Sequence, residues 1–99
     1  MKRFTEVSNI DTCMLREFCC QHEFYTRGDV RAYSNMFDMA RQYDGTPGAL
    51  SMIALDIVAH SDENVLLDYT ESGDRDEMVL DMMNMISEHC ITRWYAEVD

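Results

Sequence analysis

Four residues carry side chains that could bind a metal ion or attack a substrate: Cys19, His22, His89 and Cys90. Cys19 and His22 are three residues apart, so on a helix they share one face, and two thiolates with two imidazoles are a common ligand set for zinc. The second pair is adjacent in sequence and lacks a comparable spacing. Cysteines on an apolar helix face are also common as small core residues. We therefore predict a core role, no metal and no cofactor, with a small metal-linked module as an alternative.

An acidic segment in the second half of the chain has part of the spacing of a calcium-binding loop. Between Asp68 and Asp76, oxygen-bearing side chains occupy four ligand positions, and Gly73 occupies the position of the sharp turn. The twelfth position, where the motif requires a bidentate glutamate, is Val79. The absence of this ligand argues against a specific calcium site.

No pattern typical of catalysis accompanies the cysteines and histidines. A nucleophile needs a base, a group that orients the base and donors for the developing oxyanion, and no glycine-rich elbow or loop of this kind is present. The glycines are isolated turn residues rather than parts of a phosphate-binding loop: Gly28, Gly45, Gly48 and Gly73. We therefore expect a protein that is not an enzyme.

The distribution of charge is the most informative feature of the sequence. The chain has 99 residues and a formal net charge of −11, which argues against direct binding to nucleic acid or to an anionic membrane. Residues 56–81 contain nine acids and a single base, Arg75. Apolar residues are interleaved with these acids, unlike in a disordered acidic tail. We therefore expect the charge to lie on a folded surface.

Eight of these acids are the candidate partner-binding residues. Three of them, at steps of three and four, would share one helix face: Asp74, Glu77 and Asp81. The complete set is Asp62, Glu63, Asp68, Glu71, Asp74, Asp76, Glu77 and Asp81. Carboxylates on a rigid frame can stand in for the phosphates of a nucleic acid, because a basic groove responds to the sign and spacing of charge. The alternative is a surface that only interacts with water and favours solubility.

These observations predict a protein-binding module whose partner is a basic protein. In the sharpest form of this prediction, the partner is a nucleic-acid-processing enzyme and this protein occupies its nucleic-acid-binding groove. In size, charge and lack of catalytic motifs, the chain is similar to the small acidic inhibitors that phages and mobile elements use against restriction or CRISPR nucleases. That resemblance implies an inhibitor that acts as a nucleic-acid mimic and helps its carrier evade antiviral defence. The alternative is a structural or regulatory accessory protein that self-associates through apolar helices, for example as a homodimer.

The elements that must position these residues are mainly helical. Helix starts are indicated by Asp11, by Thr26 with Asp29, by Thr46 before Pro47, and by Asp74 with Glu77. The expected elements are a strand at 4–7, helices at 11–21, 29–43, 46–60 and 74–90, and a strand at 91–98. Residues 61–73 fit either a further helical turn or an extended connection. We expect one domain, 1–99, a compact bundle of about four helices with a small two-stranded sheet formed by the two end segments.

Apolar spacing predicts which faces are buried. The third helix is the most apolar and is expected at the centre, with Met52 and Leu55 widening its buried stripe beyond Leu50, Ile53, Ala54, Ile57 and Val58. The second helix is expected to bury one face made of Val30, Tyr33, Phe37 and Ala40, flanked by Met36 and Tyr43. The N-terminal segment has no secretory signal pattern and the chain has no long apolar run, so we expect a cytoplasmic protein with reduced cysteines.

Overall fold

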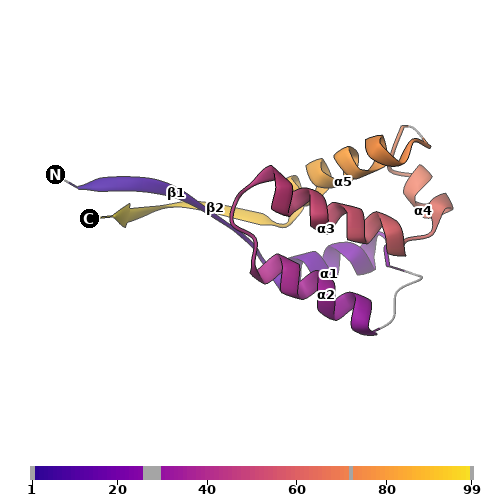
Figure 1. Ribbon diagram of the computed structural model, residues 1–99, viewed down its shortest axis with the longest axis horizontal. Coiled ribbons are helices and arrows are strands. Elements are labelled where there is room, and N and C mark those ends of the chain that lie inside the picture. The colour runs from indigo at the N-terminus through magenta and orange to yellow at the C-terminus, as the bar shows by residue number, and fades with distance from the viewer. Residues whose placement is uncertain (1, 26–29, 72, 99) are drawn as a thin grey trace.

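The computed structural model describes residues 2–25, 30–71 and 73–98. Within these residues the chain is mainly helical, with five helices and one antiparallel pair of strands (Figure 1). The elements in chain order are β1 (Arg3–Ile10), α1 (Thr12–Gln21), α2 (Val30–Arg41), α3 (Pro47–His60), α4 (Glu63–Leu67), α5 (Arg75–His89) and β2 (Ile91–Val98). The expected fold class, helices with a sheet made from the two end segments, is confirmed.

Local sequence signals explain where the helices begin. The side chain of Asp11 accepts hydrogen bonds from the backbone N–H groups of Cys13 and Met14 and caps α1. Thr46 Oγ1 accepts from the N–H of Ala49 at 3.2 Å, directly before Pro47 at the first turn of α3. Both predicted caps are confirmed. The predicted pair of Thr26 and Asp29 lies outside the described residues.

Residues 61–73, for which two conformations were open, contain the short helix α4. Asp62 caps it by accepting from the N–H of Asn64 at 2.9 Å. Leu66 is buried and anchors this single turn to the core. The connection from α3 to α4 begins at Ser61, which is buried and extended. Of the two alternatives, the further helical turn is therefore correct, and it spans Glu63–Leu67.

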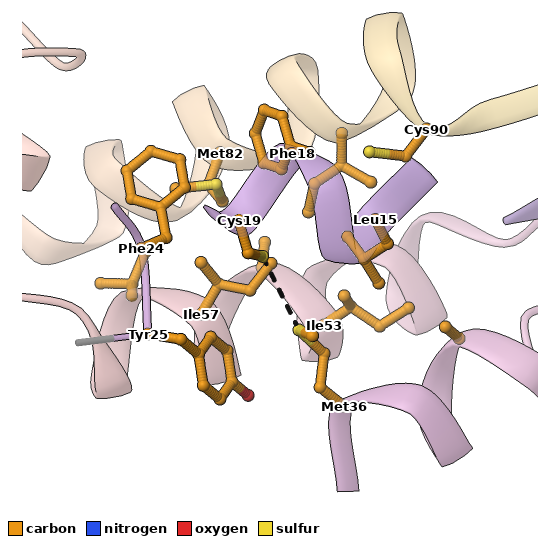
Figure 2. Packing of buried hydrophobic residues seen from close by; sticks show 14 of the residues in the cluster. Leu15, Phe18, Cys19, Phe24, Tyr25, Met36, Ile53, Ile57, Met82 and Cys90 are labelled. Atoms are coloured by element: carbon orange, nitrogen blue, oxygen red, sulfur yellow. Dashed lines mark hydrogen bonds between the residues drawn. The ribbon is translucent and has the colours of Figure 1, made fainter. Parts of the chain in front are cut away.

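The core lies between α1, α2, α3 and α5, with side chains of Leu15, Cys19, Ile53, Ile57 and Met82 fully buried at its centre (Figure 2). The predicted α3 stripe is buried as expected. The predicted widening of this stripe is wrong, because Met52 and Leu55 are exposed on the opposite side of α3.

In α2, the deepest residue is Met36 rather than Tyr33 or Phe37, which are half-buried at the edge of the core. The Cys19 Sγ donates to the Met36 Sδ at 4.0 Å, which places the two sulfur atoms in contact across α1 and α2 (Figure 2). Methionine fits this irregular space because its unbranched side chain is adaptable. The predicted burial of Ala40 is confirmed, whereas Met36, expected at the flank of the face, is buried more deeply than Tyr33 and Phe37. The side chain of Val30 lies outside the described part of the structure.

β1 and β2 form a two-stranded antiparallel ribbon that extends away from the helices, with both chain ends near its tip (Figure 1). The register runs from Arg3 opposite Val98 to Ile10 opposite Ile91. The molecule accordingly measures 53 × 28 × 21 Å along its principal axes. Among the described residues, no helix is long and apolar enough to cross a membrane.

Candidate protein-interaction surface

α4 and the start of α5 lie at the end of the helical body that faces away from the ribbon (Figure 1). The eight candidate carboxylates belong to these helices, to the connection between them and to the first half of α5. Asp62 and Glu63 begin α4, and Asp68 ends it. Glu71 follows in the connection, Asp74 caps α5, Asp76 and Glu77 lie in its first turn, and Asp81 lies near the middle of that helix. The structure therefore brings the candidates to one pole of the molecule. We call this set of eight residues the acidic end.

The end of α4 is positioned by aromatic packing against the segment that follows α1. The ring of Tyr69 lies edge-on to Phe24, with centroids 5.4 Å apart, and edge-on to His22 at 4.9 Å. Thr70 is buried, and its hydroxyl donates to the carbonyl oxygen of Leu66 at 3.0 Å. Edge-to-face aromatic pairs have favourable electrostatics in addition to the burial of apolar area. The backbone that carries Asp68 and Glu71 is thus tied to the core.

The start of α5 is positioned by a cap and by its apolar face. Asp74 accepts a hydrogen bond from the N–H of Asp76 at 2.9 Å, as predicted from the sequence. Met78 and Met82, one turn apart, are buried against the core. Glu77, directly before Met78, does not belong to this inward face and is exposed. Asp81, on the next turn, is half-buried.

Several of the eight carboxylates have a local structural role. Asp62 and Asp74 are helix caps, and Glu63, Asp76 and Glu77 lie in first turns, where negative charge interacts favourably with the helix dipole. Local helix chemistry is therefore sufficient to account for these five residues.

The other three carboxylates have no such role. Asp68 lies at the C-terminal end of α4, where the dipole disfavours negative charge. Glu71 lies between the helices, and Asp81 lies beyond the first turn of α5. These three residues are not explained by helix capping.

Basic partners are scarce at this pole. Within the described ranges, the ion pairs include none to Glu63, Asp68, Glu71, Asp76, Glu77 or Asp81. Neighbouring like charges repel each other, so this arrangement costs free energy in the isolated protein. A positively charged partner would remove that cost.

Comparison of the chain with protein-family models, curated proteins and solved structures finds no match. The argument for the acidic end as a site therefore rests on this chain's own residues and their geometry.

Sequence reasoning missed two apolar residues at the same pole. Leu67 and Tyr69 are 45% and 42% exposed and lie between the carboxylates of α4 and those of the connection. Exposed tyrosine is typical of protein-binding surfaces, because it offers a large rigid contact area together with a hydroxyl group. Their position within an acidic run was the only available signal. The acidic end thus combines charge with apolar contact area.

The ninth acid of the 56–81 segment, Asp56, has a different environment on α3. Its side chain is largely shielded, and Oδ2 is a buried atom with no hydrogen-bond partner among the described residues. Burial raises the pKa of the Asp56 carboxyl, and the nearby His60, 3.6 Å from Oδ1, opposes this shift. Asp56 is therefore not part of the exposed acidic end.

The four candidate metal ligands are not brought together as a site. Cys19 and Cys90 are buried thiols, whereas the rings of His22 and His89 each pack against the Phe18 ring, at centroid distances of 5.0 and 6.0 Å. The part of the chain that the structure describes contains no group of three or more potential ligands. All four cysteines are free thiols. The burial of Cys19 and Cys90 fits the predicted core role of these two cysteines.

Proposed function

We propose that this protein is a non-enzymatic binding module whose acidic end docks onto a basic protein. In its sharpest form, the partner is a nucleic-acid-processing enzyme and the acidic end occupies the groove that normally holds the nucleic acid. The observation that carries the proposal concerns Asp68, Glu71 and Asp81: helix capping does not explain these three carboxylates, and the ion pairs among the described residues include none to them.

The helical frame supports this proposal because it limits the positions of the charges. A basic groove selects ligands by the spacing and sign of charge, and carboxylates on anchored helices lose little conformational entropy when they bind. Leu67 and Tyr69 supply apolar contact area beside them, which a nucleic acid backbone would not. The proposed partner therefore has a basic groove with an apolar surface at its rim.

The test is affinity capture from native cells with two matched triple variants. The first variant neutralises exposed carboxylates of the acidic end that are not caps: Asp68→Asn, Glu71→Gln and Glu77→Gln. The control makes the same chemical changes at exposed positions elsewhere: Asp38→Asn, Glu17→Gln and Glu88→Gln. We expect the first variant to weaken binding of the captured partner roughly 3- to 150-fold, because exposed ion pairs contribute about 0.2–1 kcal/mol each.

Two further observations decide whether the partner's nucleic-acid groove is involved. The captured protein should be released by DNA or RNA in competition, and its binding should weaken steeply as salt is added, since exposed charges are screened. A partner that both triple variants retain equally would show that the acidic end is not the contact. Binding that does not respond to salt or to nucleic acid would contradict the groove-occupying form of the proposal.

A further inference from the structure

The ribbon of β1 and β2 exposes three large aromatic side chains. Phe4, Trp94 and Tyr95 are 62%, 44% and 72% exposed, and the ribbon extends beyond the helices that could have covered them (Figure 1). A two-stranded ribbon in water is marginally stable unless further strands or a packed layer support it. The ribbon is therefore expected to have an additional partner strand or layer.

The outer edge of β2 is the more accessible edge of this ribbon. β1 contacts α2, and its Ser8 lies beside the turn between α2 and α3, where an added Cβ at Gly45 would lie 3.2 Å from Ser8 Oγ. Apart from β1, the element that contacts β2 most is α5, the helix that leads directly into it. An eight-residue edge with unpaired backbone donors and acceptors is a template for pairing with another strand.

The residues of β2 are self-complementary about Tyr95. Arg93 lies two positions before Tyr95 and Glu97 lies two positions after it, so both charges are on the same face of the strand. When two copies of β2 run antiparallel with a two-fold axis at Tyr95, Arg93 of each copy is directly opposite Glu97 of the other. Trp94 is then opposite Ala96, and the two Tyr95 residues face each other.

We propose that a second copy of this chain pairs with the free edge of β2, giving a four-stranded antiparallel sheet across a two-fold axis at Tyr95. The occupant is a second copy because the charge pattern of β2 complements itself. Only the antiparallel register with Tyr95 opposite Tyr95 places Arg93 of each copy opposite Glu97 of the other. The surface lies on the ribbon, whereas the proposed partner of the acidic end binds at the opposite pole. Neither proposal depends on the other.

Charges already present on the ribbon fit this arrangement. Within one chain, Arg93 Nε lies 3.8 Å from Glu6 Oε1, and Lys2 Nζ lies 3.9 Å from Glu97 Oε1. Pairing at β2 extends these contacts into a row of alternating charges, in the order Glu6, Arg93, Glu97 of the second copy and its Lys2. Charges on edge strands commonly prevent pairing, but they do so when equal signs face each other. Here opposite signs meet, so the same residues favour pairing.

The other face of the sheet gains apolar contacts. Val7 is opposite Trp94 within one ribbon, and Thr5 is opposite Ala96. In the four-stranded sheet, Trp94 also meets Ala96 of the second copy, and the two Trp94 rings come within the diagonal reach of large side chains. The pairing therefore adds a neighbour to a half-exposed indole. This contact involves the only tryptophan in the chain.

Charge reversal tests both the interface and its register. Sedimentation of the unmodified chain, from about 1 to about 200 µM as appropriate for a modest interface, should show a dimer. Arg93→Glu and Glu97→Arg should each be monomeric, because each places equal charges opposite each other at both pairs. An equimolar mixture of these two variants should form a heterodimer, and the double variant should regain the homodimer. Recovery of the dimer in the mixture or in the double variant would show that the single variants are folded and have lost only the pairing between copies.

A control addresses association through the helices. Met52→Lys combined with Leu55→Lys changes the exposed apolar face of α3 and should leave the dimer intact. A chain that is monomeric throughout the range, or a dimer that survives the charge reversals and dissociates with the α3 variant, would overturn the proposal.

Cross-linking supplies a second measurement that does not depend on charge. Residues directly opposite each other in antiparallel strands have Cα atoms about 4.5–5.5 Å apart, which is within the range of a disulfide. Tyr95→Cys, made in a chain in which the exposed Cys13 and Cys20 are serine, should therefore oxidise to a covalent dimer. Failure to cross-link while the unmodified chain is dimeric would contradict the two-fold axis at Tyr95.

Discussion

The backbone N–H of Tyr25 donates a hydrogen bond to Ser61 Oγ at 3.0 Å, joining two buried positions 36 residues apart. The Ser61 hydroxyl in turn donates to the carbonyl oxygen of Ile57 at 2.6 Å, at the end of α3. Tyr25 has a positive φ of 68°, a conformation that few non-glycine residues adopt. One serine therefore links the segment after α1 to the end of α3 and holds the backbone of Tyr25 in an unfavourable conformation.

Removal of this link should destabilise the fold. Ser61→Ala is expected to lower the free energy of unfolding by about 1–3 kcal/mol, because a buried donor loses its acceptor. Denaturant unfolding followed by circular dichroism measures the change. Ser51→Ala is the matched control, since Ser51 Oγ donates to Gly48 within an exposed helix turn and its loss should change stability by less than about 0.5 kcal/mol. Equal effects of the two substitutions would contradict the structural role of Ser61.

The two caps of the acidic end should behave differently from its other carboxylates. Asp74→Ala is expected to cost about 0.5–2 kcal/mol of stability, because the first turn of α5 loses the acceptor for the N–H of Asp76. Glu77→Gln should stay within about 0.5 kcal/mol of the unmodified protein. Thermal unfolding at neutral pH measures both variants. A large loss of stability in Glu77→Gln would mean that this carboxylate is needed for the fold.

The cysteines should divide into two pairs by reactivity. Burial raises the pKa of Cys19 and of Cys90 to about 12 in each case, so these thiols carry almost no thiolate near neutral pH. Cys13 and Cys20 are exposed. We expect a thiol reagent at pH 8 to modify these two rapidly and the buried pair only after unfolding. Rapid modification of a third cysteine in the folded protein would show that the core opens.

Asp56 should make stability decrease as pH rises. Its pKa is raised by burial, so the folded state binds the proton more tightly than the unfolded state. The stabilising effect of that proton is complete below the carboxyl's ordinary value and is lost as pH rises through the raised value. Asp56→Asn should therefore raise the melting temperature at pH 7, on the order of a few degrees.

A pH series provides the control for Asp56. The difference in melting temperature between Asp56→Asn and the unmodified chain should grow from pH 4 to pH 7, since only the unmodified chain has to bury a charge. If the variant melts at a lower temperature than the unmodified protein at pH 7, the ion pair with His60 outweighs the cost of burial.

Residues whose role is set by their immediate neighbours were predictable. Thr46 before Pro47 specifies the start of α3 within a few positions, and Gly45, with φ of +87°, supplies the turn before it. The β-branched and aromatic run at 91–98 was likewise sufficient to predict β2 with its observed bounds. In each case the determining contacts are local.

Features that depend on packing between distant segments were not predictable. Met52 and Leu55 are as apolar as their buried neighbours, and only the positions of α2 and α5 decide which side of α3 faces water. α4 is too short to be stable alone, and the burial of Leu66 in the core stabilises it. For the same reason the sequence predicted the eight acids of the candidate site but not the exposure of Leu67 and Tyr69 beside them.

The pairing of β1 with β2 also has a consequence for synthesis of the chain on the ribosome. Ile10 pairs with Ile91, which is synthesised about 80 positions later. At typical elongation rates of about 5–20 residues per second, synthesis of the intervening chain takes roughly 4–16 s. During that interval β1 has both edges unpaired while the helices between the strands are already able to fold. The nascent chain therefore exposes an incomplete ribbon, and chaperone binding or premature pairing between neighbouring nascent chains would act at β1 first.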